Sequence, residues 1–437
     1  MQNIVAVFKN KDVMKKILFT FLAFLIYKTA TYITIPLINP ETISAIFEQN
    51  DGGIFGIANA LTGNALKNYS IIALGIGPYI TASIVVQLLQ MDIIPVFKEW
   101  AEEGETGKRK INQTTRYLAI GLAFVQALAM TYGFRLTGDT IFDVSVTNVN
   151  FVTYTYLAIV ITAGTAFLLW LSDQITMYGI GNGTSMIIVA GIVSSMPGMF
   201  ASLTSEYITA DAANMRSYLI FALVVLIYVA VIFFVTIMQS SYRKIPIQYS
   251  NRPANAKFRG KNDSNIPLKI NSAGVIPVIF AVTLLSIPAT VLNFIPSISS
   301  TAVGTWLNEM FTYQRPLGYV IYVALIFVFA FFYAFVQINP EKVAKNLQKQ
   351  NAYIPGVRPG VDTENYISKT LFRITVIGAT YLVLVASLPI FAAMIFNLPA
   401  YVQIGGTSLL IVVGVAIETT KQIKTQTQDQ TYSGFIR

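Results

Sequence analysis

The stretch GIGPYITA (75–82) decides the fold, because it returns as GVIPVIFA (274–281) 199 positions later. Both copies follow the pattern G-x-x-P-x-I-x-A, and each opens a long apolar segment. Membrane channels and transporters are often built from two repeated halves. The repeat therefore predicts that the second and seventh apolar segments have matching roles around one pore.

The composition of the whole chain is that of a membrane protein. Of its 437 residues, 54% are hydrophobic and 12% are charged, and its mean hydropathy is +0.60. A soluble domain carries about 25% charged residues, so lipid must solvate this apolar surface. The chain has no Cys and no His, which excludes thiol nucleophiles, imidazole metal ligands and Ser–His triads. We expect no catalytic, cofactor-binding or metal site, and no enzyme activity.

Ten segments are long and apolar enough to cross a bilayer as helices, since a span takes ~20 residues. They are 17–37, 71–90, 117–134, 152–171, 183–200, 218–238, 273–294, 317–338, 371–392 and 401–417. The first segment is longer than the apolar part of a signal peptide, and no small-residue cleavage site follows it. We therefore expect it to remain as a membrane helix.

The distribution of cations predicts the orientation. With both termini in the cytosol, 25 of the 30 Lys and Arg residues fall on the inside and four fall outside. Cytosolic loops of membrane proteins are enriched in Lys and Arg, so this split predicts ten spans with both ends cytosolic. The remaining cation, Lys28, either snorkels from the first span or faces a polar interior. The net charge of +9 reflects either this topology beside anionic lipids or a docking surface for a cytosolic partner.

Two long cytosolic loops are candidates for partner docking. Loop 240–270 carries seven Lys and Arg residues against one acid, and its RKIPIQY (243–249) alternates polar and apolar residues as a short strand does. Loop 339–370 contains IPGVRPG (354–360), whose Pro and Gly residues describe a stiff tip that presents Arg358. Solvated charge is the alternative, but long ordered loops often carry function.

Two further segments each allow two interpretations. Segment 50–69, on the outside, is Gly-rich and amphipathic, as is typical of a helix lying on the interface or of a re-entrant stopper. GIGNGTS (179–185) lacks the Lys of a phosphate loop, and we interpret it as the start of the fifth span with a Thr/Ser cap. The spans hold almost no Asp or Glu, which argues against a transporter driven by protons or sodium.

Six stretches, in order over nearly the whole chain, closely resemble the SecY/translocon alpha family of protein-conducting channels. They are ALGIGPYITASIVVQLL (73–89), GIGNGTSMIIVAGIV (179–193), RKIPIQY (243–249), NSAGVIPVIFA (271–281), IPGVRPG (354–360) and GGTSLLIVVGVAIE (405–418). The resemblance implies an all-α integral membrane protein with ten transmembrane helices in two pseudo-symmetric halves of five, 1–200 and 201–437, around a central hourglass pore. It also implies a lateral gate between spans two/three and seven/eight.

The resemblance assigns roles to particular residues. A pore ring of mostly aliphatic side chains corresponds to Ile80, Ile84, Thr184, Ile188, Ile279 and Ile411. A plug near 55–69 corresponds to Phe55, Ile57, Leu61 and Leu66, and the polar gate residues to Gln87, Gln126 and Asn271. Partner docking corresponds to Arg243, Lys244 and Arg358. Ile80 and Ile84 lie four apart and so share a helix face, whereas Thr184 departs from the usual aliphatic residue.

The function that the resemblance implies is the pore-forming subunit of the general protein translocase in the bacterial cytoplasmic (inner) membrane. Such a subunit conducts unfolded secretory polypeptides and inserts membrane proteins through its lateral gate. Its expected partners are SecE-like and SecG-like small membrane subunits, the SecA motor ATPase, the ribosome, signal peptides and anionic lipids. The alternatives are an accessory channel of the same family for specialised substrates, a small-solute secondary transporter, or a non-enzymatic membrane scaffold.

Overall fold

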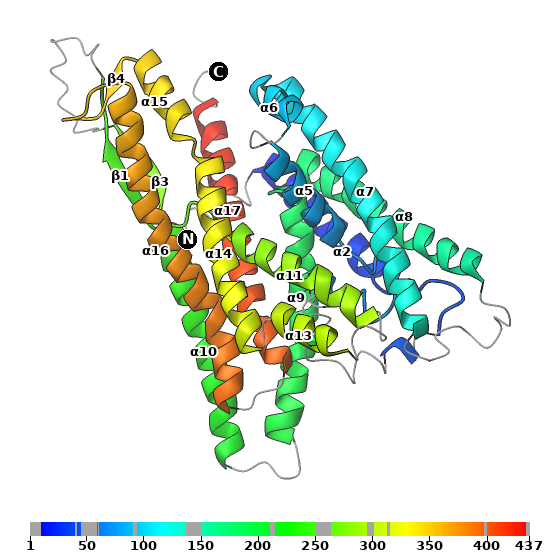
Figure 1. Cartoon of the computed structure of the whole chain (residues 1–437). Coiled ribbons are helices and arrows are strands. Elements are labelled where there is room, and N and C mark those ends of the chain that lie inside the picture. Colours follow the sequence, from blue (N-terminus) through cyan, green and yellow to red (C-terminus); the bar gives the residue numbers. More distant parts are fainter. Residues whose placement is uncertain are drawn as a thin grey trace.

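The chain forms a mostly helical structure in which two groups of helices lie side by side (Figure 1). A computed structural model describes residues 10–39, 42–44, 59, 61–90, 94–136, 150–209, 215–249, 264–294, 301–312, 315–396 and 400–433. Two small antiparallel sheets lie at the end of the second group that also carries α15.

The first group holds α2 (Lys11–Ala30), α5 (Gly77–Leu89), α6 (Pro95–Glu102), α7 (Glu105–Leu136), α8 (Phe151–Tyr178) and α9 (Gly183–Thr204). A short π-helical turn, η1 (Ser205–Thr209), follows α9. The second group holds α10 (Met215–Ser240), α11 (Ile276–Phe294), α13 (Ala302–Phe311), α14 (Pro316–Gln337), α15 (Pro340–Lys349), α16 (Val361–Phe396) and α17 (Ala400–Ser433). The strands are β1 (Tyr242–Pro246), β2 (Gln248–Tyr249), β3 (Asn265–Lys269) and β4 (Ala352–Tyr353).

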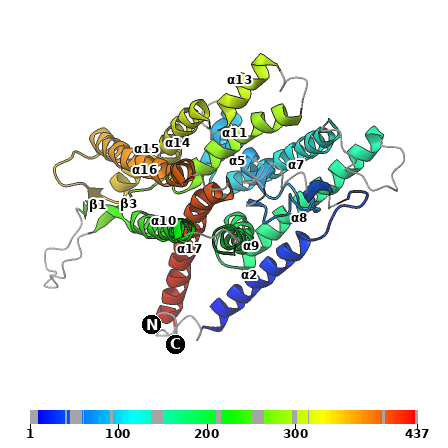
Figure 2. The same ribbon diagram turned by 90° about the horizontal axis from the view of Figure 1, so that it is seen from below.

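The two groups touch through several pairs of elements, including η1 with α10. Within the first group α7 packs on α5 and α8, and α8 packs on α2 and α9. Within the second group α14 packs on α11 and α16, and α17 packs on α16 and α10. Helix α11 of the second group contacts α5 and α7 of the first, whereas α17 contacts α9 and α2 (Figure 2). We call the contact of α11 with α5 and α7 the seam.

Each group has its own buried apolar core. The second-half core joins α10, α11, α14, α16 and α17 and includes the fully buried Val235, Ile326 and Leu382. In the first group, one cluster lies between α2, α8 and α9, and another lies between α7, α8 and residues 35–73. We call the cluster between α2, α8 and α9 the first-half core. The division into two cores follows the division into two groups of helices.

The repeated G-x-x-P pattern produces two matching helix starts. Gly75 has a φ of +56° and Gly274 has a φ of +66°, a left-handed conformation that glycine adopts at little cost. In each copy the Pro is the second residue of the helix that follows, α5 or α11. Proline is tolerated there because an N–H in the first turn has no hydrogen-bond acceptor within the helix. Because the glycine turn precedes the helix, α5 starts at Gly77 and α11 at Ile276, later than the predicted spans.

Every predicted span contains a helix, although most bounds differ. Helix α2 starts before residue 17, because the Asn10 side chain caps it by accepting a hydrogen bond from the Asp12 N–H at 3.1 Å. It ends at Ala30, and Lys28 in its last turn places its ammonium 4.9 Å from the centre of the Tyr32 ring. Tyr32 is exposed, so this contact fits a snorkelling lysine.

Five helical segments of the described residues are long and apolar enough to cross a membrane. They are Phe151–Tyr178, Gly183–Thr204, Ser217–Ser240, Pro316–Lys349 and Val361–Ala392. Helix α5 and the first part of α11, Ile276–Leu285, are apolar but shorter. The chain is therefore a multi-pass membrane protein.

The predicted strand over 243–249 is confirmed, but it divides at Ile247 into β1 and β2. Strand β1 pairs antiparallel with β3, and β2 pairs antiparallel with β4 of the other basic loop. Tyr353 donates a hydrogen bond to the Gln248 side chain at 3.1 Å. The two basic loops, which the sequence predicts to be cytosolic, are thus joined into one unit, and we call this unit the cytosolic platform.

We predict that Gly164→Ala destabilises the protein. Gly164 lies on α8, and a Cβ placed there would come within 1.8 Å of the Ile71 carbonyl oxygen, a backbone atom that cannot rotate away. Overpacking of this kind typically costs about 1–3 kcal/mol. The unfolding temperature of the purified protein in detergent should fall.

The matched control is Gly121→Ala on α7, where the added Cβ has no atom within 4 Å. There alanine gains about 1 kcal/mol of helix propensity, so the unfolding temperature should hold or rise. Equal unfolding temperatures for the wild type and Gly164→Ala would show that α8 does not pack closely on this turn.

Candidate functional site

The two predicted ring residues on α5 lie where the two halves meet. Ile84 is 6% exposed and belongs to the second-half core although α5 is a first-group helix. Ile80, one turn earlier, is half-buried and packs against both the first-half core and the second-half core. One face of α5 therefore joins the two cores.

The two predicted ring residues on α9, Thr184 and Ile188, have different surroundings. Thr184 is the second residue of the helix, and its N–H and hydroxyl both donate to the Asn182 side-chain oxygen, at 3.1 and 2.7 Å. The cap of this helix is thus Asn182, and the predicted Thr/Ser cap is wrong. Ile188 is half-buried one turn later, while its neighbour Ile187 is buried in the first-half core. That Thr184 lines the pore stays a prediction.

The other two predicted ring residues come from the second group. Ile279 is half-buried in the first turn of α11, and its carbonyl accepts a hydrogen bond from the Thr283 hydroxyl at 2.8 Å. Ile411 on α17 is 5% exposed. The six predicted residues thus come from four helices, of which α5 contacts α11 and α9 contacts α17. Their membership of one ring is not tested by these contacts.

Of the segment predicted as the plug, the structure describes residues 59 and 61–69. Phe55 and Ile57 lie outside the described residues. Leu66 is buried in the first group, whereas Leu61 packs against the second-half core. The Tyr27 hydroxyl of α2 donates to the Thr62 carbonyl at 2.7 Å. The segment therefore lies at the junction of the halves and is tied to α2.

A close backbone contact fixes the same segment against α9. A Cβ added at Gly191 would come within 2.4 Å of the Leu61 carbonyl oxygen. The Asn59 side chain holds the segment together internally, by donating to Asn64 at 3.1 Å and accepting from the Lys67 N–H at 2.9 Å. A glycine on α9 thus lets the chain lie directly on the helix.

The three predicted polar gate residues differ in their surroundings. Gln87 on α5 donates to the Ser83 hydroxyl at 3.2 Å, and its buried side-chain oxygen has no hydrogen-bond partner among the described residues. Gln126 on α7 is half-buried. Asn271 is buried, and its side chain donates to the Gly274 carbonyl at 2.9 Å, so it stabilises the turn before α11. A buried amide oxygen without a hydrogen-bond partner lowers stability by about 1–3 kcal/mol. Of the three predicted gate residues, Gln87 is therefore the one whose side chain would gain from a new hydrogen bond.

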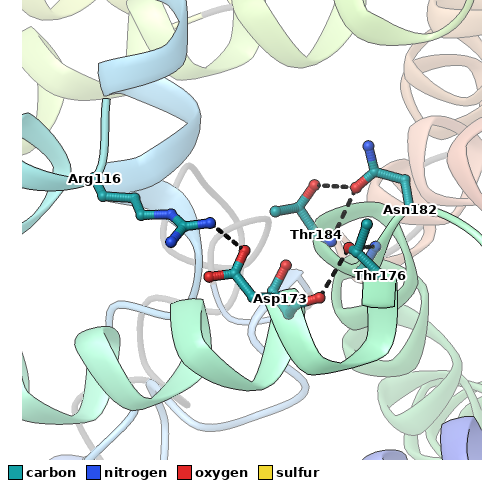
Figure 3. A network of polar contacts seen from close by, with 7 residues as sticks. Arg116, Asp173, Thr176, Asn182 and Thr184 are labelled. Atoms are coloured by element: carbon teal, nitrogen blue, oxygen red, sulfur yellow. Dashed lines mark hydrogen bonds and ion pairs between the residues drawn. The ribbon is translucent and has the colours of Figure 1, made fainter. Parts of the chain in front are cut away.

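Sequence reasoning missed a polar network at the end of the first group (Figure 3). Arg116 of α7 and Asp173 of α8 form an ion pair at 2.6 Å. Nearby, the Thr176 hydroxyl accepts a hydrogen bond from the Gly183 N–H at 2.9 Å. Asp173 was not predicted to belong to a site, because the predicted span ends at 171 whereas α8 continues to Tyr178. The network fixes α7 to α8 and α8 to the start of α9.

The turn between α8 and α9 also contacts helices of both groups. The Ile180 N–H donates to the Thr20 hydroxyl of α2 at 3.1 Å, and the Gly181 N–H donates to the Gln422 side chain of α17 at 2.9 Å. Lys16 of α2 donates to Gln426 of α17 at 3.3 Å. The GIGNGTS stretch is therefore a structural turn that joins α17 to the first group.

The predicted docking residues lie on the surface of the cytosolic platform. Arg243 and Lys244 are exposed on β1. Arg358 is exposed on a tip bounded by Gly356 and Gly360, whose φ angles are +81° and +104°. Its carbonyl accepts a hydrogen bond from the Thr363 hydroxyl at 2.8 Å, so the backbone of the tip is held while the guanidinium stays in water. A small apolar cluster that includes Ile245, Leu268, Leu347, Ala352 and Ile354 underlies the platform.

Comparison with known proteins places the chain among protein translocation channels. Residues 70–420 match the family model described as SecY. The protein translocase subunit SecY of Bacillus licheniformis is 45% identical over 429 residues, which are 98% of this chain and 97% of that protein.

Two solved structures have a similar fold. One, of a SecY protein whose plug domain is described as stabilising the closed channel, has a TM-score of 0.64 at 18% identity over 94% of this chain and 91% of that chain. The other, Sec61 in a canine ribosome–channel complex, has a TM-score of 0.62 at 17% identity and the same coverage. At this identity the likeness shows the fold alone.

We predict that Tyr27→Phe loosens the segment that begins at Leu61. The substitution removes the hydroxyl but keeps the ring, and it leaves the Thr62 carbonyl with only the hydrogen bond from the Ala65 N–H at 3.3 Å. Losing one hydrogen bond of two costs about 1 kcal/mol, so amide hydrogen exchange over 61–76 should accelerate by roughly fivefold.

Tyr32→Phe is the control, because Tyr32 is exposed near the same end of α2. It should leave the exchange over 61–76 unchanged. The same exchange rate in Tyr27→Phe and the wild type would mean that this hydrogen bond does not hold the segment.

Proposed function

The chain belongs to the SecY family, and from this we propose that it is the pore-forming subunit of the general protein translocase. It conducts unfolded secretory polypeptides across the membrane and inserts membrane proteins into it. The observation that carries this proposal is the 45% identity to a SecY translocase subunit over 98% of the chain. The helical fold shared with solved protein-conducting channels supports it.

We propose that ten transmembrane helices form two pseudo-symmetric halves of five, 1–200 and 201–437, around an hourglass pore. The matching starts of α5 and α11 support the pseudo-symmetry, because the same turn and the same Pro position recur in each half. The two cores, each built mainly from one group of helices, support the division. Residue 200 lies in the last turn of α9, so the halves join just beyond it.

The waist of the pore is the ring that the family resemblance assigns, with Ile80, Ile84, Ile188, Ile279 and Ile411 as its aliphatic members. A narrow apolar constriction resists wetting and so blocks ions while the channel is at rest. The same side chains yield around a polypeptide, because they offer no polar group to hold it. Thr184 contributes less to this seal, since its hydroxyl is bonded to Asn182.

The lateral gate is the seam, where α11 meets α5 and α7. Helix α5 contacts α11 there, and Ile84 of α5 belongs to the same apolar cluster as Val278 and Ala281 of α11. Lipid tails can replace such contacts at little cost, so the seam opens more easily than a hydrogen-bonded contact would. A signal peptide opens the gate by binding the open state more tightly than the closed state. The free side-chain oxygen of Gln87 on α5 is available to a polar group of an opened gate.

The plug is the segment near 55–69, which seals the outer side of the resting pore. Its described part touches both halves, because Leu66 lies in the first group and Leu61 packs on the second-half core. A segment held by both halves must be released when they separate. Opening of the pore and displacement of the plug are therefore coupled.

The channel itself is passive, and a partner supplies the energy. SecA or the ribosome docks on the cytosolic platform through Arg243, Lys244 and Arg358, and SecE-like and SecG-like subunits accompany the chain in the membrane. Pairing of β2 with β4 supports a shared docking surface, because it places both basic loops on one rigid unit. Anionic lipids neutralise the remaining cytosolic cations.

The protein lies in the bacterial cytoplasmic (inner) membrane with both termini in the cytosol. The asymmetric distribution of Lys and Arg supports this orientation. An accessory channel of the same family for specialised substrates is the nearest alternative, and a small-solute transporter is a more distant one. The pairing of Asp173 with Arg116 weighs against the transporter, because the acid is already neutralised by an ion pair.

We predict that a Cys at Ile279 crosslinks to a secretory chain stalled in the channel. The chain has no native Cys, so a single introduced thiol is the sole reactive site. The matched control is Leu226→Cys on α10, whose position is 66% exposed on the outer surface of the second group. Adducts should form at 279 and not at 226. A stalled chain that forms no adduct at any waist position eliminates the channel.

We predict that Arg358→Glu impairs motor-driven export while the protein still inserts and folds in the membrane. Losing a charge at the centre of a docking surface typically costs about 2 kcal/mol, on the order of thirtyfold in affinity. Arg358→Lys is the control, because it keeps the charge on the same tip. The prediction fails if export by Arg358→Glu equals that of the wild type, as measured by translocation into inverted membrane vesicles.

A further inference from the structure

We propose that helix α13 is an anchor in the lipid interface of the outer leaflet, with Trp306 as its anchoring side chain. The helix lies between α11 and α14 in sequence and contacts both of them. It would hold the outer ends of these two helices at a fixed depth in the bilayer. This inference goes beyond the proposed function, since it rests on the chain spanning a membrane in the predicted orientation and not on translocation.

One face of α13 is turned away from the protein. Val303 is 64% exposed and Trp306 is 56% exposed, and their spacing of three residues places them side by side on the helix. Gly304 is buried, so a different face packs against the protein. Figure 2 shows α13 at the rim of the molecule, beside α14. A large aromatic side chain and a β-branched one are thus presented outward together.

The helix is fixed in this position by its contact with α14. A Cβ added at Gly318 would come within 2.2 Å of the Thr312 carbonyl oxygen and 3.1 Å of the Glu309 carbonyl oxygen. The end of α13 therefore lies directly on the first turn of α14, where Gly318 has no side chain to separate them. Its exposed face cannot turn inward without breaking this contact.

Lipid is the occupant that the surroundings of this face favour. Helix α14 lies within one of the segments apolar enough to cross a membrane, and its exposed residues include Leu317, Val320 and Val328 at 44%, 66% and 61% exposure. These positions are spaced as one helix stripe that faces the lipid. Because only four residues separate the end of α13 from the start of α14, α13 lies at the outer end of that stripe.

The chemistry of the face fits the boundary between headgroups and acyl chains. Tryptophan concentrates at this boundary because its ring is apolar and its indole N–H needs a polar partner. Arg315, exposed at the start of α14, is close in sequence and suited to bond a lipid phosphate. An exposed aromatic residue and a cation in the same short stretch of chain are typical of a segment at the membrane interface.

The test measures the depth of Trp306 in lipid vesicles. The chain has three Trp residues, and Trp100 and Trp170 lie on α6 and α8. The double variant Trp100→Phe/Trp170→Phe leaves Trp306 as the one source of indole fluorescence. It is reconstituted in vesicles of phosphatidylcholine and phosphatidylglycerol that carry bromine near the head or near the end of the acyl chains.

We expect an emission maximum that is blue-shifted from that of tryptophan in water, and a greater loss of intensity with bromine near the head than near the chain end. Emission at the position of water, with quenching by dissolved iodide and none by brominated lipid, would overturn the proposal. Stronger quenching by bromine near the chain end would overturn it too, because Trp306 would then lie in the acyl core.

If the double variant does not fold, the single variant Trp306→Phe gives the same information. The difference between the fluorescence of the wild type and that of Trp306→Phe isolates the signal of Trp306. That difference should show the same order of quenching by the two brominated lipids. A difference signal that is quenched by iodide alone contradicts the anchor.

Discussion

The structure depends on an apolar contact between two helices that begin in the same way. In each half a left-handed glycine turns the chain, and a proline at the second helical position starts a helix of Ile, Val and Ala residues. These helices, α5 and α11, meet at the seam. In lipid an apolar contact gains little over contact with acyl chains, so an apolar seam can part at little cost.

The contacts between the halves away from the seam are of two kinds. On the side of α17, the halves are joined by hydrogen bonds from Gly181 to Gln422 and from Lys16 to Gln426. Helix α9 also packs on the second-half core through Met196 and Met199, and the rings of Phe200 on α9 and Tyr228 on α10 have their centroids 6.2 Å apart. If the halves separate at the seam, as proposed, these contacts keep them joined on the side of α9 and α17. The segment that is hydrogen-bonded to Tyr27 touches both halves, so its contacts change when the halves separate.

Much of this architecture could be predicted from the sequence. Hydropathy located a helix in each of ten places, and alternation located a strand at 243–249, because both patterns are local properties of composition. The helix ends were predicted less well, because caps decide them. Asn10 extends α2 toward the N-terminus, Asn182 begins α9, and the turn made by Gly75 delays α5. A hydropathy pattern does not record hydrogen bonds of this kind.

The candidate site was predictable in part. The ring residues on α5 were placed on one helix face by their spacing, and Ile80 and Ile84 do lie where the halves meet. Long-range contacts could not be read from the chain. The ion pair of Arg116 with Asp173 joins residues on different helices, and β2 pairs with a strand about a hundred residues away. The hydrogen bond from the Asn271 side chain to the Gly274 carbonyl was not predicted, and the place of Asn271 at the gate stays a prediction.

The central claim is that aliphatic side chains at the waist seal a pore, and the resting ion conductance of the reconstituted protein tests it most directly. The account predicts that replacing Ile80, Ile84, Ile188, Ile279 and Ile411 by glycine, singly and together, raises that conductance. Leu226→Gly on the outer surface carries the same helix penalty of about 1 kcal/mol and should not raise it. Equal conductance in the ring variants, the surface variant and the wild type would contradict the account.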